Sequence, residues 1–119
     1  MENIKIYHNA RCSKSRCGLE LVKNSGQPYT IVNYLEQPPA ADELKIILSK
    51  LKIPPIELVR KKETIWKEKF ENQSLTDEQI IQAMAMYPKL IERPIVVLGD
   101  KAVIGRPPEN IENLLKENQ

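Results

Sequence analysis

The sequence has few cysteines, few glycines and no long apolar run, and each shortage narrows what the protein can be. Two cysteines in 119 residues are too few for a disulfide framework, and a chain of this size can bury a core without crosslinks. No apolar run approaches the roughly 20 residues that span a bilayer. The first residues also lack the charged and apolar segments of a secretion signal. We therefore expect a single domain, residues 1–119, in the reducing cytoplasm and without membrane contact.

An excess of charge of one sign is also lacking. The chain has 18 Lys and Arg residues against 16 Asp and Glu residues, which leaves a net charge of +2. Such a balance does not favour bulk electrostatic binding of nucleic acid. We therefore expect no nucleic-acid partner. The only histidine is His8, and because no other metal ligands adjoin it, we expect no metal site either.

The pattern of apolar and turn residues predicts an α/β fold that begins with a βαβ unit. Residues 4–8 alternate as in a short strand, and residues 13–24 have helical spacing that ends before Gly26. Residues 29–35 are β-branched and aromatic, as in a second strand. A strand, a helix and a strand within about thirty residues form a βαβ unit.

The middle of the chain predicts helices. Apolar residues recur at helical spacing from Leu44 to Leu51, and Thr76 with Gln79 has the pattern of a capping box. Residues 38–92 are therefore predicted to be a helical insertion.

The last part of the chain returns to strands. Gly99-Asp100 separates two apolar runs, as in a two-residue hairpin, and Pro107-Pro108 open a final helix. The order βαβ, helices, ββα is that of a thioredoxin-like α/β fold. It predicts a mixed four-stranded sheet with the insertion between the second and third strands.

Cys12 is the strongest candidate for a reactive residue. In a βαβ unit it lies between the end of the first strand and the start of the first helix, where free N–H groups stabilise an anion. Arg11, Lys14 and Arg16 add positive charge nearby, and such surroundings lower the pKa of a thiol. The alternative is a buried structural cysteine, but the polar segment NARCSKSR favours reactivity.

Cys17 is a poor redox partner for Cys12. A Cys-x-x-Cys motif would place its second cysteine at position 15, which is Ser15. Cys17 lies five helical positions from Cys12, which is ~8 Å along the axis, whereas the Cα atoms of a disulfide rarely lie more than ~7 Å apart. We predict a monothiol site whose resolving thiol comes from another molecule.

His8 and Ser15 each allow two interpretations. His8 either tunes Cys12 or is a hydrogen-bonded residue at the strand end without a chemical task. Ser15 either supports the thiolate through a hydrogen bond or satisfies the backbone of the helix.

Three arginines suggest an oxyanion site. Arg93 precedes Pro94 at the start of the third strand, where the X-Pro bond is a candidate cis peptide. Arg106 ends the fourth strand, and Arg60 ends a helical stretch. Guanidinium groups bind tetrahedral oxyanions through paired hydrogen bonds, so three of them around a thiolate would form an anion site. The alternative for each arginine is a solvated surface charge.

The segments IYHNARCSKSR, YLEQPP, ERPIVV and IGRPPE, together with Arg60, carry a family resemblance. The chain resembles the glutaredoxin-coupled, or ArsC-like, arsenate reductases, and most closely their reductase-like members of unsettled substrate. The resemblance implies Cys12 as nucleophile with His8 beside it. It also implies Arg60, Arg93 and Arg106 as the oxyanion-binding residues.

The resemblance further implies a reaction. The Cys12 thiolate would attack arsenate, glutathione would be the reducing co-substrate, and glutaredoxin would be the partner that completes reduction to arsenite. No bound cofactor is implied, and we expect a monomer. Two residues depart from the family pattern: Ala10 replaces a common Pro, and Ser13 stands where established reductases often have Gly.

The sequence is compatible with two other functions. One is a monothiol, glutathione-dependent oxidoreductase acting on another substrate. The other is a regulator of the same fold that binds RNA polymerase, although Ser15 removes the Cys-x-x-Cys switch of that branch. A Cys-x5-Arg phosphatase is excluded, because Gly18 stands six positions after Cys12.

Overall fold

The computed structural model describes residues 3–117, which fall into two compact units. The sheet unit holds the described residues up to Gln37 and those from Arg93 onward. The helical unit is Pro38–Glu92.

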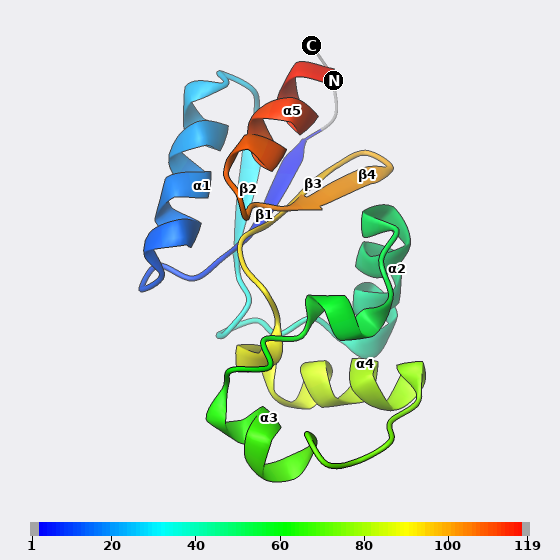
Figure 1. Cartoon of the computed structure of the whole chain (residues 1–119). Coiled ribbons are helices and arrows are strands. Elements are labelled where there is room, and N and C mark those ends of the chain that lie inside the picture. Colours follow the sequence, from blue (N-terminus) through cyan, green and yellow to red (C-terminus); the bar gives the residue numbers. More distant parts are fainter. Residues whose placement is uncertain (1–2, 118–119) are drawn as a thin grey trace. The chain divides into compact units, whose positions relative to one another are not determined.

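The sheet unit combines four strands with two helices (Figure 1). Its elements are β1 (Ile4–His8), α1 (Ser13–Asn24), β2 (Tyr29–Asn33), β3 (Ile95–Leu98), β4 (Lys101–Ile104) and α5 (Glu109–Glu117). The strand order is β2-β1-β3-β4, with β1 parallel to β2 and the other neighbours antiparallel. The predicted thioredoxin-like α/β fold with a mixed four-stranded sheet is confirmed.

Helices α1 and α5 lie on the same face of the sheet (Figure 1). Apolar side chains from both helices and from β1 and β3 form one buried cluster beneath them. Its fully buried members are Ile4, Ile6, Val22, Val96 and Ile111. Removing this apolar surface from water is the main force that holds α1, and with it the residues before α1, against the sheet.

The register of the two parallel strands determines which residues meet beyond their ends. His8 is the Cα partner of Asn33, so β1 and β2 end at the same edge of the sheet. The residues that follow, Asn9 in one loop and Tyr34 in the other, therefore leave the sheet side by side.

Two sequence predictions within these strands are wrong in detail. The second strand was predicted to reach Leu35, but it ends at Asn33 because the N–H groups of Glu36 and Gln37 both donate to the Asn33 carbonyl, 2.9 Å away, and turn the chain. Residues 4–8 were predicted to alternate as in a half-buried strand, but Tyr7, on the other face from Ile4 and Ile6, is buried as well. β1 is a central strand, paired along both edges, and its last three residues are all buried.

The helical unit contains α2 (Ala41–Leu51), α3 (Thr64–Lys69) and α4 (Asp77–Met86), with 3₁₀ turns at Pro55–Leu58 and Pro88–Leu90. The predicted capping box is confirmed: the Gln79 N–H donates to Thr76 Oγ1 at 3.2 Å, and the Thr76 N–H donates to Gln79 Oε1 at 2.8 Å. Helix α3, which was not predicted as a separate element, is a short helix with Trp66 as its one buried residue. Across residues 3–117, no helix is long and apolar enough to cross a membrane.

Candidate active site

The loop between β1 and α1 presents Cys12 at the start of the helix. Cys12 is the N-cap residue, with an extended backbone (φ −95°, ψ 121°). Its N–H donates to the Asn9 carbonyl at 3.0 Å, and the Asn9 side chain accepts the Arg11 N–H at 3.0 Å. Asn9 therefore holds the loop in a tight turn that places Cys12 at the start of α1.

Two of the three arginines that were predicted to bind an oxyanion lie next to Cys12. Arg106 Nη2 donates to Cys12 Sγ at 3.4 Å, and Arg106 Nε donates to the Arg93 carbonyl at 2.8 Å. The Arg93 side chain also acts on the thiol by hydrogen bonding and by charge. The structure thus surrounds the sulfur with two guanidinium groups from the β3 and β4 side of the sheet.

The surroundings of Cys12 favour the thiolate. Burial of the sulfur raises the pKa of Cys12, but other groups outweigh this effect and leave the pKa below its ordinary value. The Ser15 backbone N–H has the largest lowering effect, followed by the Arg93 side chain and the Lys14 backbone N–H. The two N–H groups lie in the first turn of α1, although neither forms a full capping hydrogen bond with the cysteine side chain. This combination of helix start and cation is what lowers the pKa of reactive cysteines.

The basic residues near Cys12 in sequence contribute differently from what was expected. Lys14 acts on the thiol through its backbone N–H. Arg16 donates from Nη1 to the Ala10 carbonyl at 2.9 Å and so braces the loop, while Arg11 lines a neighbouring pocket. The cation that lowers the pKa of Cys12 is the distant Arg93.

His8 and Ser15 form a buried polar pair. Ser15 Oγ accepts the Asn9 N–H at 3.0 Å and lies 2.7 Å from His8 Nδ1. Burial lowers the pKa of His8, a hydrogen bond to the Ser15 backbone raises it, and the positive charges of Arg16 and Lys23 lower it; the net shift is downward. His8 is therefore neutral at neutral pH. Ser15 supports the thiolate with its backbone N–H, while its hydroxyl holds the histidine.

Close packing at Pro94 explains how both arginines reach the site. The Gly105 N–H donates to the Pro94 carbonyl at 2.8 Å, which ties the residue before Arg106 to the residue after Arg93. A Cβ atom at Gly105 would stand 2.8 Å from Pro94 Cγ, and one at Gly18 of α1 would stand equally close. The Arg93-Pro94 peptide bond is cis, as the sequence suggested, and Arg106-Pro107 is cis as well.

Arg60 belongs to the helical unit and is described within it. Its side chain pairs with Glu63 and Glu92, each at 3.6 Å, and its N–H donates to the Leu90 carbonyl at 2.7 Å. One guanidinium atom, Nη1, is buried without a hydrogen-bond partner among the described residues. Its predicted part in an oxyanion site with Cys12 stays a prediction.

Both cysteines are free thiols. Cys12 is half-buried, and Cys17 is exposed on α1. No disulfide joins them, which agrees with the spacing argument that gave a monothiol site.

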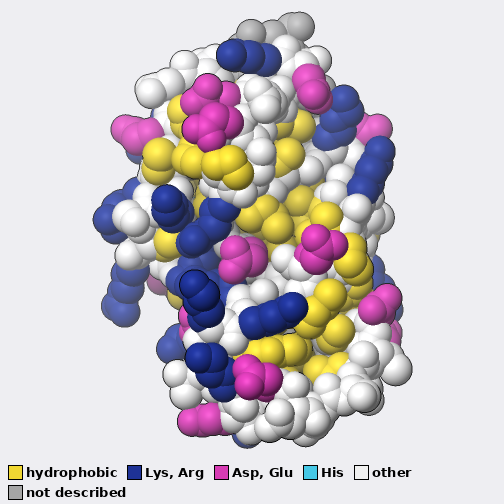
Figure 2. All heavy atoms as spheres, viewed as in Figure 1, with side chains coloured by type: hydrophobic (Ala, Val, Ile, Leu, Met, Phe, Trp, Pro, Cys, Tyr) yellow, Lys and Arg dark blue, Asp and Glu magenta, His cyan; other side chains and the backbone are white. Residues whose placement is uncertain are grey.

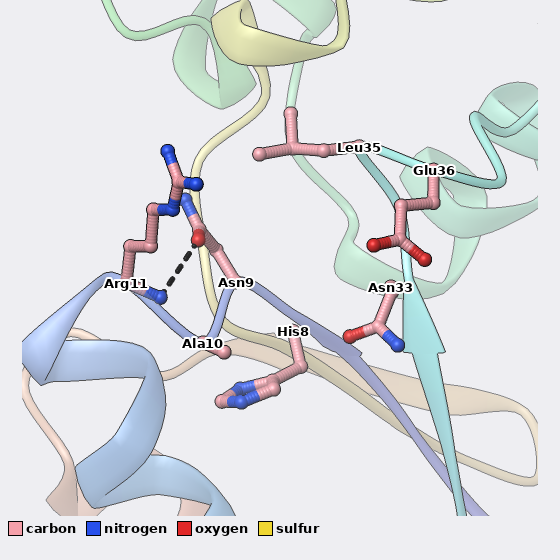
Figure 3. A pocket seen from close by; sticks show the side chains of 7 residues that line it. All are labelled: His8, Asn9, Ala10, Arg11, Asn33, Leu35 and Glu36. Carbon is pink, nitrogen blue, oxygen red and sulfur yellow. Dashed lines mark hydrogen bonds between the residues drawn. The ribbon is translucent and has the colours of Figure 1, made fainter.

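A pocket of about 260 Å³ opens beside the loop that precedes Cys12. It is lined by His8, Asn9, Ala10, Arg11, Asn33, Leu35 and Glu36 (Figure 3). Arg11 and Glu36 stand at opposite sides of the pocket in this view, so it presents one positive and one negative charge. Sequence reasoning missed Asn33 and Glu36, although a parallel β1–β2 pair places the residues after β2 next to those after β1.

Within residues 3–117, no group of three or more His, Cys, Asp and Glu side chains is placed to hold a metal ion. Figure 2 shows acidic side chains among the basic ones on the visible face, as the near balance of charge leads one to expect.

Comparisons with known proteins agree on one family. The model of the ArsC family matches residues 7–114. An arsenate reductase of Neisseria meningitidis is 44% identical over 117 residues, which cover 97% of this chain and 100% of that protein. Escherichia coli YfgD, described as uncharacterised, is 49% identical over 112 residues, or 92% of this chain and 94% of that one. The solved structure of an arsenate reductase from Vibrio cholerae is 41% identical, with a TM-score of 0.89 over 94% of this chain and 97% of that chain.

Proposed function

Because the chain belongs to the ArsC family, we propose that it is an arsenate reductase in which the Cys12 thiolate is the nucleophile. Relatives named arsenate reductase cover nearly the whole chain at 40–44% identity. The observation that carries the proposal is the Arg106 guanidinium, 3.4 Å from Cys12 Sγ, beside a second guanidinium from Arg93. This arrangement suits a nucleophile that must approach an anion.

The arginines remove the main obstacle to the first step. Arsenate is negatively charged at neutral pH and would repel a thiolate. Guanidinium groups on the arsenate oxygens offset this repulsion and stabilise the charge that develops as sulfur attacks. A bond forms between Cys12 Sγ and arsenic, and one arsenate oxygen leaves as water after it has gained two protons.

Reduction of As(V) to As(III) needs two electrons from outside the chain. Cys17 is exposed and unpaired, and the described residues hold no other thiol. We propose glutathione as the reducing co-substrate and glutaredoxin as the partner. Glutathione sulfur replaces a second oxygen on arsenic, and a further thiol attacks that glutathione sulfur. A disulfide leaves as arsenic takes up the electron pair, and water then releases arsenite from Cys12.

Arg60 is proposed as a third oxyanion ligand. In the helical unit it is held by two carboxylates, and its Nη1 atom is buried without a hydrogen-bond partner among the described residues. An unpaired donor on a fixed guanidinium is suited to bind an anion, because leaving it unpaired costs stability.

The test is a coupled assay that measures NADPH consumption. The purified protein is supplied with arsenate, glutathione, glutaredoxin and glutathione reductase, with Cys12→Ser as the inactive variant and Cys17→Ser as the matched control. Saturable turnover that is lost only in Cys12→Ser supports the proposal. Absence of turnover in the folded wild-type protein refutes arsenate reduction.

A second candidate is a glutathione-dependent oxidoreductase of another substrate. The pocket beside the loop favours it, because Arg11 and Glu36 present charges of both signs to a ligand, and glutathione carries both carboxylates and an amine. Turnover with a glutathione mixed disulfide, without turnover on arsenate, would identify this activity.

A further inference from the structure

Tyr34 lies at the edge of the sheet where the candidate active site is built. It follows Asn33, the last residue of β2, whose partner in β1 is His8. The same register brings Tyr34 next to Asn9, the residue that shapes the Cys12 loop. Tyr34 therefore adjoins the site through the sheet, although sequence analysis assigned it only to a strand.

The Tyr34 side chain is buried and its hydroxyl is unpaired. The residue is 1% exposed, and its hydroxyl makes no hydrogen bond of ordinary geometry with a described residue, although the Asn9 and Arg93 side chains lie close enough to lower its pKa. A buried hydroxyl without a partner costs stability, on the order of 1–3 kcal/mol. Proteins keep few such groups, and those they keep call for an explanation such as a bound ion.

A second unpaired donor lies beside the first. Arg93 Nε is also buried and without a hydrogen-bond partner among residues 3–117. The Arg93 charge acts on both Tyr34 and Cys12, so the two unpaired donors and the thiol belong to one cluster. A ligand with several acceptor oxygens, bound next to the Cys12 nucleophile, would give both donors a hydrogen-bond partner.

The protonation state of Tyr34 fits the role of a donor. Burial raises the pKa of Tyr34, the Arg93 charge and weak hydrogen bonding from the Asn9 and Arg93 side chains lower it, and the Cys12 thiolate raises it; the net shift is upward. The phenol is therefore protonated at neutral pH. Tyr34 is near enough to sense the charge of Cys12 but is not among the groups that support the thiolate.

We propose that the Tyr34 hydroxyl and Arg93 Nε donate hydrogen bonds to a tetrahedral oxyanion bound over Cys12, which makes Tyr34 a substrate-binding residue. This deepens the proposed function, because it adds a neutral donor to an oxyanion site otherwise made of guanidinium groups. A neutral donor with a fixed direction binds an oxygen without adding charge, and so favours oxyanions whose geometry places an oxygen at that point.

The test measures oxyanion affinity without turnover. Sulfate, which is not reduced, and arsenate in the absence of thiols are titrated by calorimetry into the wild-type protein, Tyr34→Phe and Tyr29→Phe. Tyr29 is the matched control, since it is an exposed tyrosine at the other end of the strand that Tyr34 follows. We expect Tyr34→Phe to weaken binding about tenfold or more, as for the loss of a hydrogen bond to a charged group. Tyr29→Phe should stay within twofold of the wild type.

Thermal unfolding separates this role from a structural one. Removal of an unpaired buried hydroxyl should leave the melting temperature of Tyr34→Phe unchanged or raise it. If the variant folds poorly, the wild-type protein with ¹³C-labelled tyrosine gives a second measurement. Sulfate should shift the Tyr34 Cζ resonance and leave that of Tyr29 unmoved.

The outcomes distinguish this proposal from the proposed function. Binding that depends on Tyr34, without arsenate turnover in the coupled assay, would support the oxyanion contact and refute arsenate reduction. Turnover together with sulfate affinity within twofold of the wild type in Tyr34→Phe would refute the contact alone. If the wild-type protein binds no oxyanion, or if sulfate leaves the Tyr34 resonance unmoved, the contact is likewise refuted.

Discussion

Arg106 Nη2 lies 3.4 Å from Cys12 Sγ, although 94 positions separate the two residues in the chain. The contact is held in place by the hydrogen bond from Arg106 Nε to the Arg93 carbonyl. Both arginines adjoin prolines, and Pro94 is linked to Gly105 by a backbone hydrogen bond. The nucleophile and its cations thus come from opposite ends of the chain and meet because β1 pairs with β3.

The two cysteines should differ sharply in importance. Cys12→Ser should abolish turnover, because the less acidic hydroxyl cannot supply the nucleophile, whereas Cys17→Ser should retain most of it since Cys17 is exposed and unpaired. The coupled assay described above measures both variants. Equal losses in the two would contradict a monothiol site.

The arginines should control both oxyanion affinity and the pKa of Cys12. Arg93→Ala removes a cation and a hydrogen bond that lower this pKa. The rate of alkylation by iodoacetamide should therefore reach its midpoint at a higher pH than in the wild type, since only the thiolate reacts.

Arg11→Ala is the matched control, because Arg11 precedes Cys12 but lines the neighbouring pocket. Its midpoint should stay close to that of the wild type. Arg93→Ala and Arg106→Ala should both weaken sulfate binding by about tenfold or more. Unchanged affinity in both folded variants would refute the oxyanion site.

His8, the only histidine, can be titrated without overlap by NMR. Its midpoint should lie below that of an exposed histidine, near 6.5, because burial disfavours the charged imidazole. Ser15→Ala removes the contact between the Ser15 hydroxyl and His8 Nδ1 but keeps the Ser15 backbone group whose hydrogen bond raises the pKa of His8, so the midpoint should change little.

The same Ser15→Ala variant tests how position 15 supports the thiolate. It keeps the backbone N–H that lowers the pKa of Cys12, so the alkylation midpoint should change little. A large rise in that midpoint would show that the hydroxyl supports the thiolate, contrary to the geometry.

Gly105 should be intolerant of a side chain. In Gly105→Ala the new Cβ would stand 2.6 Å from Ile111 Cδ1 and 2.8 Å from Pro94 Cγ. Overpacking of this kind costs about 1–3 kcal/mol, and the shift should also weaken sulfate binding through Arg106. Urea unfolding measures the stability.

Lys101→Ala, at an exposed position of β4, is the control for Gly105→Ala. It should change the free energy of unfolding by less than about 0.5 kcal/mol, since it removes only a surface ion pair. Equal stability of the two variants would contradict the packing argument.

The sequence predicted the main elements of the sheet unit because their signals are local. Helix α1 was predicted with its observed bounds, Ser13–Asn24, and the residues around Gly99 were predicted as a hairpin. Apolar periodicity and turn residues act over a few positions, so one segment suffices to show them. The signals were weaker for α3, which is short and buries one side chain.

The candidate site could be predicted only in part, for a related reason. The position of Cys12 at the start of a helix can be read from its neighbours in the sequence. The lack of a second redox cysteine can be read there too, because Ser15 stands at the position where a Cys-x-x-Cys motif would have it. Which cation lowers the pKa of the thiol depends on distant contacts. Arg11, Lys14 and Arg16 were expected to do so from their nearness in sequence, but the side chain that does so is that of Arg93, which the sequence had predicted only as an oxyanion ligand.

By itself, the sequence determined the α/β fold, a lone cysteine at the start of its first helix, and arginines next to the prolines of the later strands. Only the tertiary structure decided that Arg106 contacts the sulfur, that Ser15 holds His8, and that Tyr34 is buried with an unpaired hydroxyl. The physical reason is that secondary structure follows from interactions between near neighbours in the chain. The charge and hydrogen bonding at a thiol follow instead from strand pairing and from the packing of Pro94 against two glycines.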